Sequence, residues 1–341
     1  MHYLLPRDLV TTALVCRDWL PTARMLLYRH IYFNTSSPLT AQLESSLRSS
    51  PHLRILIRHL VLIHYDYVND GLLEWIALLP EHSLVSVKFE RMPFDGADPR
   101  SLLQFPAVRT ADEIIISHPH FLLRNPERLS DIFSNSFLSR LTLFIPKSLP
   151  LRLVGPLKLN RLSIAIWTED RPQLLGTILE SITSPLHHLD LLLSNLRPET
   201  ISWLNTILER HLPTLKRLII RALDRKQTAP FFDGMIASLV SLEVLACGPG
   251  TYTSRLFNQL PTSLRSLTLD TRDNEPFSVS ELREAVTRLR SRSTAFKSMT
   301  IGRHPSYASH RYFDTLSQAC ASLGVSFVIM KPRLGDYLLG N

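Results

Sequence analysis

The sequence predicts an α/β protein built as a repeat array, in which short parallel strands alternate with helices. Two observations predict this class. An apolar frame of the form Leu-x-x-Leu-x-Leu, with other apolar residues substituting, returns at nearly constant spacing along the 341 residues. The segments between copies of the frame carry apolar residues at helical spacing, which favours one buried helical face per unit.

Twelve copies of the frame can be read from the sequence. Successive copies are 21 to 32 residues apart, with a mean of about 27, which lies in the range of leucine-rich repeats. Side chains alternate across a strand, so the apolar residues of each frame should point into one core. The last apolar residues of the copies are Phe33, Leu62, Phe89, Ile116, Leu143, Ile164, Leu191, Ile220, Cys247, Leu269, Ile301 and Ile329.

Helices are expected in the intervals between the frames. Apolar residues within 72–79, 174–182, 201–208 and 282–289 recur at three- and four-residue steps, so they fall on one helical face. A strand with one helix cannot close a core alone, whereas stacked units can. The sequence therefore predicts a leucine-rich-repeat solenoid, with a curved parallel sheet and outer helices. A doubly wound α/β fold is the alternative, although twelve short strands would be unusual there.

The frame departs from the usual repeat at the position three residues after its last leucine. Leucine-rich repeats commonly place Asn or Cys near this point. This chain has other residues there, such as Tyr65, Pro146 and Arg272. We therefore expect the backbone groups of the loops to be satisfied by other means.

Composition narrows the functional classes. Hydrophobic residues make up 45% of the chain, and the net charge of +8 is spread without a basic block. The three cysteines, Cys16, Cys247 and Cys320, include no Cys-x-x-Cys pair, which argues against a disulfide framework or a zinc knuckle. The chain shows neither the apolar run of a signal peptide nor a stretch of membrane-spanning length. A soluble protein of the cytoplasm or nucleus is expected.

The residues before the first frame carry a motif. Val-Cys-Arg-x-Trp at 15–19, with Asp8 and Leu9 before it, resembles the second half of an F-box, and residues 26–31 are similar to the exit of fungal F-box proteins. The resemblance does not cover the first helix of the F-box, because only Leu5 and Pro6 of the family's opening pattern precede Asp8. In that family the domain docks a Skp-type adaptor of a cullin ubiquitin ligase. The resemblance implies adaptor contacts by Leu9, Leu14, Val15, Cys16, Arg17 and Trp19.

The predicted organisation has three parts. A partial F-box-like helical segment covers 1–33, a degenerate solenoid of about eleven repeats covers 34–330, and a tail covers 331–341. From the residues alone, the apolar stripe of the first segment could instead cap the open end of the solenoid, and both roles can hold.

A column of cations is expected on the concave face of the sheet. The residue before the second leucine of four consecutive frames is Arg140, Arg161, His188 and then Arg217. Neighbouring strands lie about 4.8 Å apart, so these side chains would repel one another without an anion nearby. Arginine forks suit carboxylates and phosphates. We expect the column to bind an acidic or phosphorylated segment of a client protein, with four solvated charges as the alternative.

The sequence contains no motif of a catalytic or metal site. The close histidine pairs, His118 with His120 and His187 with His188, lack a further ligand at suitable spacing. No nucleophile elbow or phosphate loop is present. The basic stretch at 288–292 lacks interleaved aromatic residues, which disfavours nucleic-acid binding.

The function predicted from the sequence is that of a non-catalytic substrate-recognition subunit of an SCF-type cullin ubiquitin ligase, without cofactor or metal. A client protein would bind the concave repeat face, and a Skp-type adaptor would bind the N-terminal helices. Two alternatives remain open: a leucine-rich-repeat scaffold without ligase docking, and an enzyme on an unrecognised α/β fold.

Overall fold

The chain divides into two compact units in the computed structural model. Unit 1 comprises Met1–Phe144 and Leu149–Lys158, and unit 2 comprises Ile145–Ser148 and Leu159–Asn341. The residues that the structure describes are 17–34, 37, 39–63, 70–90, 99–117, 132–133, 135–145, 155–166, 173–193, 198–222, 230–270, 279–302 and 310–330.

Unit 1 alternates strands with short helices. Its elements are η1 (Arg17–Trp19), α2 (Leu20–Arg29), β1 (His30–Asn34), α3 (Leu39–Ser49), α4 (Pro51–Arg54), β2 (His59–Ile63), η2 (Asp70–Leu78), β3 (Ser86–Glu90), α5 (Pro99–Gln104), α6 (Pro106–Arg109), β4 (Glu113–Ile116) and β5 (Arg140–Ile145). Strand β1 begins inside the segment predicted as helical, 1–33, and pairs in parallel with β2.

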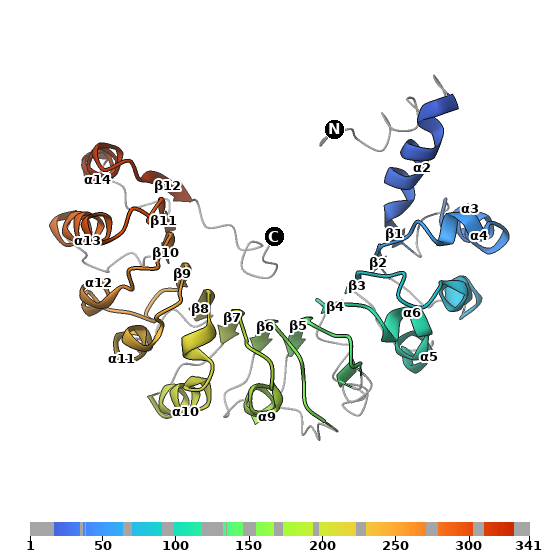
Figure 1. Ribbon diagram of the computed structural model, residues 1–341, viewed down its shortest axis with the longest axis horizontal. Coiled ribbons are helices and arrows are strands. Elements are labelled where there is room, and N and C mark those ends of the chain that lie inside the picture. The colour runs from blue at the N-terminus through green and yellow to red at the C-terminus, as the bar shows by residue number, and fades with distance from the viewer. Residues whose placement is uncertain are drawn as a thin grey trace. The chain divides into compact units, whose positions relative to one another are not determined.

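Unit 2 repeats the same alternation. Its elements are β6 (Arg161–Ile166), α9 (Gln173–Ser181), β7 (His188–Leu193), α10 (Pro198–Leu208), η3 (Leu212–Thr214), β8 (Arg217–Ala222), α11 (Phe232–Met235), η4 (Ile236–Ser238), β9 (Val244–Cys247), α12 (Arg255–Gln259), β10 (Ser266–Asp270), α13 (Val279–Arg292), β11 (Ser298–Gly302), α14 (His310–Ser322) and β12 (Ser326–Met330). In each unit the helices lie on one side of the strands (Figure 1).

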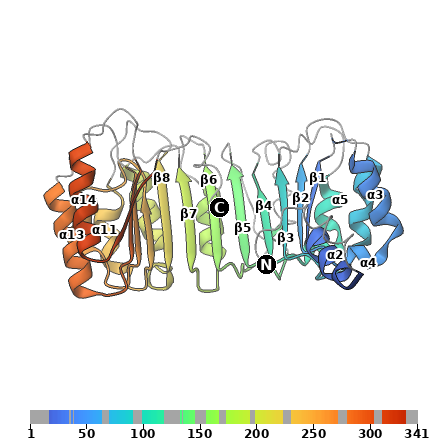
Figure 2. The same cartoon turned by 90° about the horizontal axis from the view of Figure 1, so that it is seen from above.

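Within each unit the strands follow the order of the chain, from β1 to β5 in unit 1 and from β6 to β12 in unit 2. Within each unit the paired strands are parallel, as Figure 2 shows by the common direction of the arrows. The predicted frames coincide with these strands, and the second apolar residues of successive frames are register partners. In unit 1 these partners are Ile31, Leu60, Val87, Ile114 and Leu141, and in unit 2 they are Leu162, Leu189, Leu218, Leu245, Leu267, Met299 and Phe327. The prediction of a leucine-rich-repeat α/β fold is confirmed by this order and register.

Most predicted helices are present, but the interval near 72–79 forms the 3₁₀ helix η2 rather than an α-helix. A 3₁₀ helix brings residues three apart into one line. Leu73, Ile76 and Leu79 follow that spacing, and all three are buried. These three residues reach the core along a line with a period of three, and Trp75, which lies beside that line, is completely buried as well.

Polar side chains connect successive repeats just before the strands. In each connection, a side chain of one repeat donates a hydrogen bond to the carbonyl oxygen of the first frame residue of the preceding repeat. The bond from Asn135 is buried and the other three are partly buried, so they satisfy backbone carbonyl groups that are at least partly shielded from water. The connections are Asn135 to Ala111 at 3.0 Å, Ser184 to Leu159 at 2.8 Å, Thr214 to Leu186 at 3.0 Å and Ser263 to Leu242 at 2.8 Å.

These connections do not test the expectation about the backbone groups of the loops that follow the strands, which stays a prediction. They lie ahead of the strands, whereas the asparagine of a standard repeat follows the strand. The positions named for the expectation, Tyr65, Pro146 and Arg272, lie outside the described residues.

Candidate functional site

The strands expose one face and bury the other. Along β2, β3, β6 and β10, half-exposed residues alternate with buried ones, as the two-residue period of a strand requires. The buried residues form the core with the helices, so the half-exposed residues lie on the opposite face of the sheet. We call this opposite face the open strand face and describe it separately for each unit.

On the open strand face of unit 2, three predicted client-binding residues are brought together. Arg161 on β6 is the register partner of His188 on β7, which is in turn the register partner of Arg217 on β8. All three are half-exposed. Neither arginine forms an ion pair with a carboxylate in the part of the chain that the structure describes. The two guanidinium groups therefore stand on either side of one histidine.

Two further charged residues belong to this face, and sequence reasoning missed both. Arg221 lies four residues after Arg217 on β8, so it points to the same side. Asp190 on β7 is the register partner of Ser163 on β6 and of Ile219 on β8. Side chains two and four residues after the positions of His188 and Arg217 lie on the same side of the strand. Extending the frame by these steps would have found Asp190 and Arg221.

Burial and neighbouring charges shift the pKa values of three side chains on the open strand face of unit 2. Burial lowers the pKa of His188 from its usual value, and Arg161 and Arg217 lower it further, so this imidazole is neutral near pH 7. Burial also lowers the pKa of Arg217, against the influence of Asp190. The pKa of Asp190 is raised by burial, although Arg221, Arg217 and Arg161 all act to lower it.

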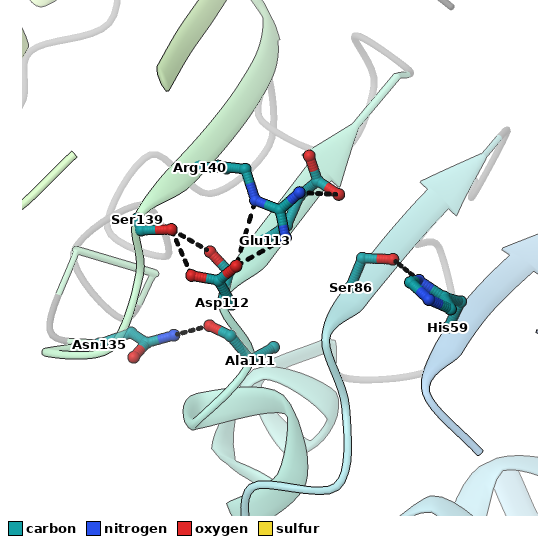
Figure 3. A network of polar contacts seen from close by, with 8 residues as sticks. All are labelled: His59, Ser86, Ala111, Asp112, Glu113, Asn135, Ser139 and Arg140. Atoms are coloured by element: carbon teal, nitrogen blue, oxygen red, sulfur yellow. Dashed lines mark hydrogen bonds and ion pairs between the residues drawn. The ribbon is translucent and has the colours of Figure 1, made fainter. Parts of the chain in front are cut away.

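Arg140, the fourth predicted client-binding residue, lies in unit 1 and has partners of its own. Its guanidinium donates to one carboxylate oxygen of Asp112, from Nη2 at 2.6 Å and from Nε at 3.2 Å, and Nη1 lies 3.8 Å from Glu113 Oε2. Figure 3 shows the guanidinium between the two carboxylates, with Ser139 bonded to Asp112 as well. Arg140 is therefore neutralised by its neighbours, unlike Arg161 and Arg217.

The same strand position holds a histidine pair at the start of unit 1. The rings of His30 and His59 stack with centroids 4.3 Å apart and an interplanar angle of 5°. His59 Nδ1 lies 2.8 Å from Ser86 Oγ (Figure 3). Burial lowers the pKa of His59 to about 4, and the charges of His30, Arg29 and Arg140 act in the same direction. The pKa of His30 is lowered by burial and by Arg29.

This pair makes the stability of unit 1 dependent on pH. Because the folded-state pKa of His59 lies below the unfolded value of 6.5, its contribution is complete above pH 6.5 and is lost as the pH falls to about 4. His59 stays partly exposed, and with solvent screening we expect a loss of about 1–2 kcal/mol. Unfolding free energies measured from pH 7.5 to 4 should show this slope, and His59→Gln should flatten it. Equal slopes in the two proteins would contradict the assignment.

The N-terminal segment shows part of the predicted adaptor surface. Arg17 and Trp19 form η1, and both side chains are exposed, with Trp19 56% exposed. The following helix, α2, buries only Ala23 among its ten residues and leaves Met25 44% exposed. The other predicted adaptor contacts, Leu9, Leu14, Val15 and Cys16, lie outside the described residues.

The two cysteines that the structure describes are poorly suited to act as nucleophiles. Cys247 and Cys320 are free and buried. Burial raises the pKa of Cys247, with Asp233 adding to the effect, and burial raises the pKa of Cys320 to about 11. Both thiols are therefore weak nucleophiles at neutral pH. Among the described residues, no three His, Cys, Asp or Glu side chains are grouped to hold a metal ion, and no helix is long and apolar enough to cross a bilayer.

Comparisons with known proteins give similarity at the level of structure alone. No protein-family model matches the chain, and no curated protein matches it. The leucine-rich-repeat-containing protein LegL7 from Legionella pneumophila aligns with a TM-score of 0.47 and 12% identity, covering 80% of this chain and 90% of LegL7. The yeast Rad7 and Elc1 complex aligns with a TM-score of 0.46 and 14% identity, covering 96% of this chain and 98% of the aligned chain. The leucine-rich-repeat fold of this protein rests on its own strand order, register and repeat length.

Proposed function

We propose that this chain is the substrate-recognition subunit of a cullin-type ubiquitin ligase. In this proposal the N-terminal helical segment binds a Skp-type adaptor, and the open strand face binds a client protein. Catalysis is left to other subunits. The proposal draws on the F-box resemblance at 15–19 and on the repeat array that follows it.

The observation that carries the proposal is the exposure of Trp19. A covered indole buries about 150–250 Å², and Trp19 is 56% exposed, so about half of that area stays in water and forgoes about 2–4 kcal/mol of hydrophobic stabilisation at about 25 cal/mol per Å². Trp19 lies in the motif that implies adaptor docking, and Met25 follows on a helix that packs little of its own surface. A partner that covers Trp19 and Met25 would recover that stabilisation.

Client binding is supported by the open strand face of unit 2. Arg161 and Arg217 lie on the two parallel strands beside β7 and form no ion pair among the described residues, although Asp190 lies diagonally from both. Unpaired cations in register favour an anionic partner. Arg140 belonged to the same prediction, but its pairing with Asp112 makes it a weaker candidate.

Adaptor docking can be tested by co-purification with a Skp-type adaptor. We expect Trp19→Ala to weaken adaptor binding by about tenfold or more, because truncating a central aromatic anchor removes about 2 kcal/mol. Removal of residues 1–29 should abolish binding while retaining β1, which begins at His30. Leu78→Ala is the matched control, since Leu78 is 49% exposed but lies in η2.

The outcomes of this experiment separate the two proposed roles. Adaptor binding that survives both Trp19→Ala and removal of residues 1–29 would rule out docking through this segment. A full-length chain that binds no adaptor would favour the leucine-rich-repeat scaffold. Circular dichroism of each variant should show an unchanged melting temperature for Trp19→Ala, because Trp19 is already exposed.

A further inference from the structure

The charged residues of unit 2's open strand face converge on one position. Asp190 has Ile219 as its register partner on β8, so its diagonal neighbours on that strand are Arg217 and Arg221. On the other side its register partner is Ser163, so Arg161 is a diagonal neighbour on β6. Three arginines therefore occupy the diagonal positions around Asp190, and the charges of all three act to lower the pKa of its carboxyl group.

The charges of this cluster do not balance. Three guanidinium groups face the single carboxylate of Asp190, and His188 is neutral near pH 7, so an excess of two positive charges remains. Strands β6 and β8 are two strand spacings apart, or about 10 Å. Arginine side chains are long enough to reach toward the middle of that interval from both sides.

We propose that Arg161, Arg217 and Arg221 form a binding site for a phosphorylated side chain of a client segment. A phosphoserine or phosphothreonine brings a charge of about −1.5 to −2 and three acceptor oxygens, which suits three guanidinium forks and the excess charge. A single carboxylate would leave one positive charge unmatched. This inference rests on the proposed client-recognition role and specifies the chemistry of the client.

The neighbouring residues set the polarity of the site. His188 lies between Arg161 and Arg217 and, as a neutral imidazole, can donate one hydrogen bond without adding charge. Asp190 acts as a competing anion in the free protein. A bound phosphate must overcome its repulsion, so removal of this carboxylate should strengthen binding.

The probe for this site is a degenerate nonapeptide library with a fixed central phosphoserine. Matched libraries carry serine or glutamate at that position. We expect the full-length protein to capture the phosphoserine library at least tenfold better than either matched library. Equal capture of the glutamate library would overturn the phosphate assignment, and no preference over serine would overturn the site.

Substitutions test which residues of the protein bind the phosphopeptide. Arg161→Gln with Arg217→Gln should reduce phosphopeptide capture by about tenfold to a hundredfold, because two charge-assisted bonds are lost. Arg140→Gln is the matched control and should change capture by less than about twofold, since that arginine is already paired. Asp190→Asn should increase capture severalfold. Capture that survives the double substitution, or that falls equally in Arg140→Gln, would overturn the proposal.

Folding and function are separated by two further measurements. Arg217→Lys keeps the charge and loses the fork, so it should reduce capture by an intermediate amount in a protein with an unchanged melting temperature. Adaptor co-purification on the same samples tests the ligase role independently. Adaptor binding without phosphopeptide capture would overturn this inference alone, and capture without adaptor binding would overturn the ligase role alone.

Discussion

Replacing Trp75 by alanine is expected to lower the unfolding free energy of unit 1 by about 3–5 kcal/mol, as for other large buried aromatic residues. Trp75 lies in η2 and is completely buried, and its ring centroid is 5.4 Å from that of Phe33 on β1. The substitution leaves a cavity between the first strand and the helix that covers it. Thermal and urea denaturation should both report the loss.

The matched control is Trp75→Phe. The indole nitrogen Nε1 is buried and has no hydrogen-bond partner among the described residues. A phenyl ring removes this unsatisfied donor while keeping most of the apolar contact, so we expect a loss of only about 1–2 kcal/mol. If Trp75→Ala and Trp75→Phe lost the same stability, the buried aromatic contact would not be the main contribution of this residue.

The second large effect is expected from Asn135→Leu. Asn135 is 8% exposed, and it donates from Nδ2 to Ala111 O at 3.0 Å and accepts at Oδ1 from the Phe137 backbone nitrogen at 2.9 Å. Leucine has a similar volume and leaves both backbone groups without a partner. The expected loss is about 2–4 kcal/mol, because leaving the buried Ala111 carbonyl unpaired costs about 1–3 kcal/mol and the partly buried N–H of Phe137 adds to that cost.

A milder substitution at another repeat provides the comparison. The single hydroxyl hydrogen of Ser263 is shared between Leu242 O, 2.8 Å from Oγ, and Val240 O, 3.0 Å from Oγ, in surroundings that are partly exposed. Water can replace the lost donor, so Ser263→Ala should lower stability by only about 0.5–1.5 kcal/mol. Urea denaturation at a single pH would compare the two variants. A larger loss at Ser263 than at Asn135 would show that burial does not decide the importance of these connections.

The fold could be predicted from the sequence because its dominant signal is a repeated one. Each frame is short, and alone it would not identify a strand. The near-constant spacing of the frames predicts that equivalent residues lie side by side, as Leu189 does with Leu162 and Leu218. The conformation of η2 could not be predicted in this way. Leu72, Leu73, Ile76 and Leu79 fit an α-helical face, and the core contacts that select a 3₁₀ helix are set by other repeats.

The strand positions of the predicted client-binding residues could be predicted from the sequence, but the pairing of their charges could not. Arg140, Arg161 and Arg217 occupy equivalent frame positions, and the sequence places all three on the open strand face. Whether each charge is paired depends on residues outside the frame, such as Asp112, which precedes β4 and reaches Arg140 from the neighbouring repeat. The frame identifies only positions that recur in every repeat. It therefore misses an ion-pair partner such as Asp112, which occurs in a single repeat.

The hydrogen bonds between successive repeats also affect how the molecule unfolds. Asn135, Ser184, Thr214 and Ser263 each reach back by one repeat, over 21 to 28 residues of chain. Loss of one such tie weakens a single step of a linear sequence of interfaces, and its effect fades with distance along the array. We therefore expect local opening of one repeat to leave distant repeats folded, which hydrogen exchange would measure as different protection along the chain.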